Sequence, residues 1–163
     1  FRGTKRTLSI NKEKVQVQIP AGIKPGSKLR LKAKGNIQPG TGRRGDLFLK
    51  LEIEPHPIWT LDGDDLRAEL PVTLDELAIG GTIKVMTPDG EAEMLIPTST
   101  PVGRCLRLKG KGWPNQSGRG DLLLSLHIQL PREWTSEEMA LLEKLKKIRS
   151  YEPRKTWLQS AQI

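Results

Sequence analysis

Short stretches in which apolar and polar residues alternate recur along the chain. Residues 15–19, Val-Gln-Val-Gln-Ile, alternate strictly, and every second residue of 47–53 and of 122–128 is Leu or Ile. Because successive side chains of a strand point to opposite faces, each stretch is typical of a β-strand with one buried face. Gly- and Pro-containing turns, for example at 24–27 and 88–90, separate the stretches. Many short strands joined by such turns favour a sandwich or a small barrel.

Two stretches depart from this pattern and predict helices. Residues 73–79 begin with the Thr-x-x-Glu pattern of a capping box and are followed by two glycines, so a short helix is expected there. Thr-Ser-Glu-Glu at 135–138 opens a second helix, in which apolar residues follow at helical spacing as far as Ile148. Lys and Arg gather toward its C-terminal end, where the helix dipole favours cations. Residues 150–163 show no clear period and are predicted to form a tail.

An internal repeat is the strongest feature of the sequence. Residues 19–53 resemble residues 96–128: Leu-Arg-Leu-Lys at 29–32 recurs at an offset of 77. After a loop that is two residues shorter in the second copy, Arg-Gly-Asp-Leu at 44–47 recurs at an offset of 75. Two copies at this spacing indicate two homologous domains rather than a solenoid, which needs about three or more units.

The repeat predicts a mainly β protein: two tandem homologous β-sandwich domains with a short helix each, followed by a C-terminal dimerisation helix. The expected boundaries are 1–54 for the first domain, 55–130 for the second, 131–149 for the helix and 150–163 for the tail. Phe-Arg-Gly-Thr at the start of the first copy aligns with Ile-Gly-Gly-Thr at 79–82, so the strand and helix that precede these residues in the second copy have no counterpart. We therefore expect the chain to be a fragment of a longer one, with its first domain incomplete at the N-terminus.

Composition narrows the class of protein. The hydrophobic fraction of 36% is enough for packed cores, and no apolar run approaches the roughly 18 residues of a membrane span. Cys105, the single cysteine, favours a reducing, cytoplasmic location. The charge is uneven: net +9 over 1–54, −7 over 55–100 and +6 over 101–163, which sum to +8. Such basic segments are either a surface for polyanions or acidic tails, or the solvated faces of strands.

Three segments carry a family resemblance. IPAGIKPGSKLRLKAKG at 19–35, RRGDLFLKLEIEPHPIWTLDGDDLRAELPVTLDELAIGG at 43–81 and TPDGEAEMLIP at 87–97 resemble the C-terminal client-binding region of DnaJ-type co-chaperones, and the likeness covers about residues 3–148. The chain lacks the His-Pro-Asp of a J-domain and any Cys-x-x-Cys, so it is similar to the class without the zinc finger.

The resemblance implies a co-chaperone that binds unfolded or non-native polypeptides and delivers them to a DnaK-type 70-kDa chaperone, in protein folding, prevention of aggregation and the stress response. It also implies a homodimer formed through the C-terminal helix, with Leu141, Leu142 and Leu145 as the contacts. Packing of that helix back on the second domain is the alternative. No cofactor, metal or membrane is implied.

The resemblance assigns sites as well. It implies that clients bind beside the first edge strand, where Leu8 and Ile10 face an apolar depression and Trp59 lies at its border. Backbone pairing and a shallow apolar pocket suit the recognition of many sequences. It places the acidic tail of the 70-kDa partner at Lys5 and Arg6. The alternatives are core packing for the aliphatic pair, a plug at the domain junction for the tryptophan and a solvated strand face for the basic pair.

Other functions have weaker support in the sequence. No Ser/His/Asp set or pair of carboxylates indicates an enzyme. The rival function is DNA binding, because a stripe of basic residues could face phosphates. Those residues are Lys28, Arg30, Lys32, Lys34, Arg107, Lys109 and Lys111. Few aromatic residues are interleaved for base stacking and no groove-reading helix is evident, which argues against this function. A purely structural dimerisation scaffold is the third possibility.

Overall fold

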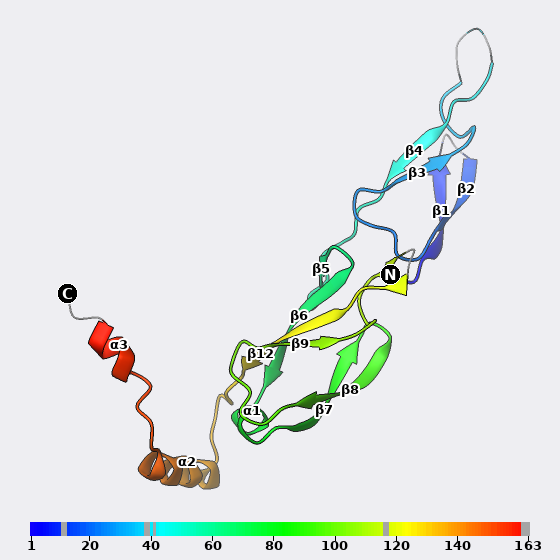
Figure 1. Ribbon diagram of the computed structural model, residues 1–163. Coiled ribbons are helices and arrows are strands. Elements are labelled where there is room, and N and C mark those ends of the chain that lie inside the picture. The colour runs from blue at the N-terminus through cyan, green and yellow to red at the C-terminus, as the bar shows by residue number, and fades with distance from the viewer. Residues whose placement is uncertain (11–12, 38–39, 41, 116–117, 161–163) are drawn as a thin grey trace. The chain divides into compact units, whose positions relative to one another are not determined.

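The computed structural model describes residues 1–10, 13–37, 40, 42–115 and 118–160 (Figure 1). Contacts divide the chain into two compact units, Phe1–Gln129 and Leu130–Ile163. The first unit holds both copies of the repeat and all the strands, and the second holds two helices. The predicted mainly β fold is confirmed.

The first repeat consists of two hairpins. β1 (Thr4–Ile10) pairs with β2 (Glu13–Ile19), and β3 (Lys28–Leu31) pairs with β4 (Leu47–Lys50), both antiparallel. Val17, at 2% exposure, is the one apolar residue among the described residues of this repeat that is fully buried. The first repeat therefore has little core of its own.

The second repeat is larger. Its elements are β5 (Thr60–Asp62), β6 (Asp65–Val72), α1 (Leu74–Ile79), β7 (Gly81–Thr87), β8 (Gly90–Ile96), β9 (Cys105–Leu108), β10 (Pro114–Asn115), β11 (Gly118–Arg119) and β12 (Leu122–Ile128). Four strands lie side by side in the order β5-β6-β12-β9, with β12 parallel to β6 and antiparallel to β9 (Figure 1). β7 and β8 form a hairpin, as do the short strands β10 and β11.

The core of the first unit lies in the second repeat. Leu122, Leu124 and Leu126 of β12 are 0%, 2% and 1% exposed, and they pack with Leu66 of β6 and Ile96 of β8. The alternation of apolar residues in β12 puts all three leucines on one face, as the sequence predicts. Burial of each such side chain contributes about 1.5–3 kcal/mol.

The two copies reproduce each other's contacts. The Asp46 carboxylate accepts from the Ala33 N–H at 2.9 Å, and its counterpart Asp121 accepts from the Gly110 N–H at 2.7 Å. That backbone bond, followed by one from Arg30, holds the pKa of Asp46 below its ordinary value. Both bonds close the loop after the Leu-Arg-Leu strand, so the aspartate of each Arg-Gly-Asp triplet has the same structural role.

The arginines of the two triplets also have equivalent roles. Arg44 forms a bidentate pair with Glu13, the first residue of β2, at 3.0 and 3.1 Å. Arg119 bonds Asp89, at the turn between β7 and β8. The arginines lower the pKa of both carboxyls, chiefly by hydrogen bonding. Each Arg-Gly-Asp triplet is therefore tied to the hairpin that precedes it in its repeat.

Three features differ from the sequence-based predictions. Only the second repeat has a helix among its described residues, whereas one was expected in each; the first repeat is described from Phe1, which corresponds to Ala78 near the end of that helix. The expected strand at 47–53 ends at Lys50. The β1–β2 and β7–β8 hairpins align at an offset of 77, so Gly3 (φ 72°) matches Gly80 (φ 76°) rather than Gly81. At each of these two glycines an added Cβ would clash with the backbone just after the second strand of the hairpin. This shared crowding supports the alignment.

The second unit contains α2 (Ser136–Ile148) and α3 (Lys155–Ser160). The predicted capping box at the start of α2 is present: Glu138 N–H donates to the Thr135 hydroxyl at 3.2 Å, and Thr135 N–H donates to the Glu138 carboxylate at 2.7 Å. Helix α3 lies in the segment that was predicted to be a tail. It is too short for a periodic pattern to reveal it. Among the described helices, none has the length and apolar character to cross a membrane.

Candidate functional site

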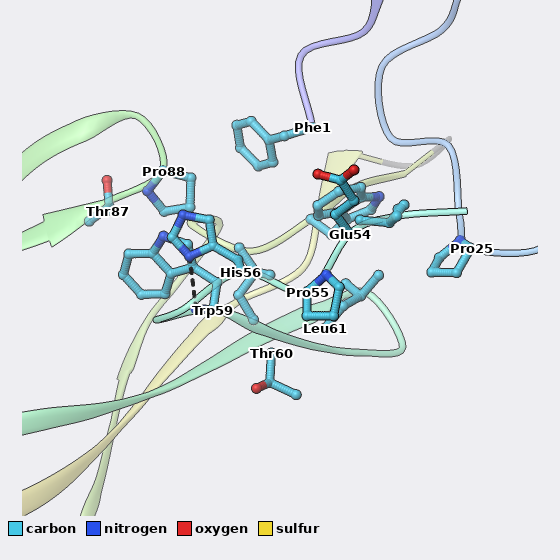
Figure 2. Close-up of a pocket in the computed structure, with 13 residues that line it drawn as sticks. Phe1, Pro25, Glu54, Pro55, His56, Trp59, Thr60, Leu61, Thr87 and Pro88 are labelled. Atoms are coloured by element: carbon cyan, nitrogen blue, oxygen red, sulfur yellow. Dashed lines mark hydrogen bonds between the residues drawn. The ribbon is translucent and has the colours of Figure 1, made fainter. Parts of the chain in front are cut away.

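A pocket of about 670 Å³ lies within the first unit, where the last strand of the first repeat leads into the second (Figure 2). Its walls come from the first repeat, the linking segment and the second repeat. The lining residues are Phe1, Pro25, Ile53, Glu54, Pro55, His56, Trp59, Thr60, Leu61, Leu66, Thr87, Pro88 and Trp113. Most of them are apolar or aromatic, and the volume is in the range of about 300–1,000 Å³ that small-ligand sites have.

A tight turn holds Trp59 at the pocket. The His56 ring nitrogen Nδ1 accepts from the backbone N–H of Ile58 at 3.1 Å and from that of Trp59 at 3.2 Å, one of which is drawn in Figure 2. The two rings then stack, with centroids 6.2 Å apart and an angle of 26°. An Nδ1 that accepts carries no proton, so the tautomer of His56 with its proton on Nε2 fits this turn.

The opposite wall contains a second aromatic pair. Phe1 meets Trp113 edge to face, with centroids 5.7 Å apart and an angle of 73°. The Arg119 guanidinium lies 4.9 Å from the centroid of Phe1, within the range of a cation–π contact. It also donates to the Gly112 carbonyl at 2.9 and 3.1 Å. Arg119 also donates to Asp89 in the β7–β8 turn, so this turn helps to hold the wall in place.

Trp113 carries an unsatisfied hydrogen-bond donor. The residue is 8% exposed, and its Nε1 has no partner in the part of the chain that the structure describes. Tyr and Trp donors that are buried usually find an acceptor, and a buried donor without one costs about 1–3 kcal/mol. Nε1 itself is closed to solvent, so a ligand in the open pocket does not reach it in this conformation.

Contacts between the repeats hold the pocket together. Lys24 Nζ lies 2.6 Å from the Asp64 carboxylate, and this bond, with one from Asn115, lowers the pKa of Asp64. Gly22 packs against the second repeat so closely that a Cβ there would lie 2.4 Å from the Pro114 carbonyl oxygen. The Lys24 pair is partly exposed and contributes modestly. The close packing at Gly22 fixes the approach of the two repeats.

The predicted client residues are not all in this pocket. Trp59 lines it, at the junction that the alternative interpretation, a plug between the domains, gave it, and its role in client binding stays a prediction. Leu8 and Ile10 lie on β1, half-buried and on the same face as Val17, and they are not among the lining residues. Their role in client binding stays a prediction, and so does that of Lys5 and Arg6. Both basic residues are exposed on β1 and form no ion pair with another described residue.

Sequence reasoning missed Phe1, His56 and Trp113. For Trp113 the sequence did hold a signal, because the alignment of the two repeats matches it with Asn36 of the first copy. A large aromatic residue that replaces a small polar one at a matched position marks a place where the copies have diverged. For the other two, the sequence held no such signal, because their positions depend on how the repeats pack.

The basic stripe considered for DNA is partly neutralised by ion pairs. The paired side chains are Arg30 with Asp46, Lys34 with Glu13, Arg107 with Asp121 and Lys111 with Asp89. These pairs reduce the positive charge that this face presents to a phosphate backbone. No group of three or more potential metal ligands is found among the described residues.

The fold is mainly β and holds two repeats in tandem, and comparison with known proteins identifies its family. The family model described as "DnaJ C terminal domain" matches residues 1–131, so the chain belongs to this family. A DnaJ-like protein of Synechocystis sp. is 44% identical over 155 residues, which are 94% of this chain and 46% of that protein. Chaperone protein DnaJ 2 of Thermus thermophilus is 42% identical over 149 residues, 89% of this chain and 51% of that protein.

A third relative, chaperone protein DnaJ of Acetivibrio thermocellus, is 38% identical over 131 residues, 79% of this chain and 34% of that protein. The chain thus spans about half the length of the first two relatives and a third of the other. The resemblance to the DnaJ C-terminal region is confirmed. Nothing in the comparisons supports DNA binding.

Proposed function

We propose that this chain is the client-binding part of a DnaJ-type co-chaperone and that it holds non-native polypeptides for a DnaK-type chaperone. The observation that carries this proposal is the apolar pocket at the repeat junction, which Trp59 and Trp113 help to line. Family membership and the names of the relatives, which are chaperone proteins, support it.

The chemistry of the pocket suits clients of many sequences. Its apolar lining rewards any large hydrophobic side chain, because the gain depends on buried area rather than on shape. An extended segment with an exposed apolar residue satisfies this requirement. Native proteins bury such residues, so the same site discriminates in favour of unfolded chains.

The finer parts of the proposal concern partners. Lys5 and Arg6 would receive an acidic tail of the 70-kDa chaperone, because they are exposed and free of ion pairs with described residues. A homodimer would form through α2, where Leu141 and Leu145 are 63% and 49% exposed and Leu142 is half-buried. The cytoplasm is the compartment that fits a free, exposed Cys105.

The test is a titration of a labelled, permanently unfolded polypeptide with this chain, followed by fluorescence anisotropy at low and at high salt. Apolar capture predicts that binding persists at high salt, because only the contacts between surface charges are screened. Labelled duplex DNA is titrated in parallel. Tight DNA binding that collapses with salt, together with no binding of the unfolded polypeptide, would overturn the proposal in favour of a charge-driven surface.

A further inference from the structure

The turn that carries Trp59 depends on one acceptor atom. Pro57 has no N–H, so the amides that this turn must satisfy are those of Ile58 and Trp59. Both donate to Nδ1 of His56, at 3.1 and 3.2 Å, and neither donates to another described residue. One lone pair therefore holds both amides, in the way that an Asn or Asp side chain closes an Asx-turn.

The same imidazole ring supports the indole of Trp59. His56 is exposed, Trp59 is half-buried, and the two rings stack with their centroids 6.2 Å apart (Figure 2). Trp59 also packs against the core of the second repeat and lines the pocket. The core therefore positions the indole on one side, and His56 positions it on the other.

Only a neutral imidazole can hold this turn. Its Nδ1 accepts hydrogen bonds when the proton is on Nε2, whereas both ring nitrogens of an imidazolium carry protons and neither accepts. Uptake of a proton at Nδ1 would therefore remove both hydrogen bonds and set a third N–H against the other two. Histidine side chains undergo this change between about pH 5 and pH 8.

Other charged groups lie on the elements that form the pocket. Glu54 lines the pocket on the same segment as His56, and burial lowers the pKa of the Phe1 amino group. Arg119 lowers the pKa of Asp89 in the β7–β8 turn, so this carboxylate stays ionised where histidine titrates. Further charged side chains there are paired or bonded: Lys24 with Asp64, Lys111 with Asp89 and Arg2 with the Pro88 carbonyl. None of these groups accepts from the two amides of the turn, so a direct effect of pH on the turn falls on His56.

We propose that His56 is a positioning residue whose action depends on pH: neutral His56 holds Trp59 at the pocket wall, and protonation of His56 releases the indole and weakens client binding. The inference rests on the proposed function, because it concerns the regulation of the same pocket. The two hydrogen bonds are made by the neutral ring, so they are complete above the pH range in which histidine titrates and are lost as the pH falls through it. The chain therefore holds a client at neutral pH and releases it in acid.

The test compares anisotropy titrations at pH 7.5 and at pH 5.5, both at high salt, with a labelled unfolded polypeptide that contains no histidine. The wild-type chain is expected to bind about tenfold more weakly at pH 5.5, because both hydrogen bonds that position the indole are lost. His56→Asn keeps an acceptor that takes up no proton, so its affinity should be equal at the two pH values. His56→Phe keeps the ring stack without the acceptor and should bind at both pH values as weakly as the acidified wild type.

Two controls separate His56 from the other titrating groups. A pH response that arises from Glu54, Asp89 or the Phe1 amino group would persist in His56→Asn. The other histidine of the chain, His127, is exposed on β12 and outside the pocket, so His127→Asn should keep the wild-type response.

Nuclear magnetic resonance of the chain without client separates the turn from client binding. The amide signals of Ile58 and Trp59 should shift in step with the titration of the His56 ring, and His56→Asn should lose this transition. Amide signals that do not follow the ring would overturn the inference. Equal wild-type affinity at the two pH values, or an equal loss of affinity in His56→Asn, would overturn it while the proposed function stands. No binding of the polypeptide at either pH would overturn the proposed function and, with it, the release of clients in acid.

Discussion

Replacement of Trp59 by alanine removes one wall of the pocket and tests whether the pocket captures clients. The indole stacks on His56 and lines the cavity, so its free face is available to a bound side chain. If a client covers roughly 80 Å² of apolar surface there, about 25 cal/mol per Å² gives about 2 kcal/mol. A loss of binding free energy of this size is typical of an aromatic residue that dominates an interface. It corresponds to about a 30-fold increase in Kd.

The assay is the anisotropy titration with an unfolded polypeptide, run at high salt so that apolar contacts dominate. Trp157→Ala is the matched control, because Trp157 is 66% exposed on α3 and lies outside the pocket. We expect less than a twofold change for the control. Because Trp59 also packs against the core, the near-ultraviolet circular dichroism of the variant is compared with that of the wild type. A correctly folded Trp59→Ala chain that binds with wild-type affinity would refute the reasoning and leave the pocket without a role in client capture.

Three further predictions concern other parts of the chain. The double substitution Leu141→Lys and Leu145→Lys on α2 should turn a dimer into a monomer in sedimentation. Glu143→Lys, an equal charge change on the opposite helix face, should leave the dimer intact. A wild-type chain that is already monomeric would contradict the dimer. Thr135→Ala should weaken the α2 cap by about 1 kcal/mol and speed amide exchange in its first turn about fivefold, with Thr135→Ser close to wild type; unchanged exchange would mean that the cap contributes nothing. The pKa of Asp46 is lowered in the folded chain, so its stabilisation is complete above the ordinary value of 3.8 and is lost as the pH falls through the folded pKa. The difference in unfolding free energy between wild type and Asp46→Asn, from urea titrations, should therefore shrink as the pH falls from 6 to below 3, and a difference independent of pH would contradict this role.

The sequence by itself determined the strands, the helix caps and the duplication. Alternation of leucines defined β12 because the period of a strand is two residues, and Thr-x-x-Glu defined the starts of α1 and α2 because a capping box satisfies backbone donors locally. These features depend on residues close together in the chain. The repeat added long-range information, since matched residues such as Asp46 and Asp121 must have matched surroundings.

Tertiary structure alone decided the pocket. Phe1, His56 and Trp113 are far apart in sequence and meet only because Gly22 lets the repeats approach closely. No local pattern encodes such a meeting, because it depends on the packing of whole hairpins.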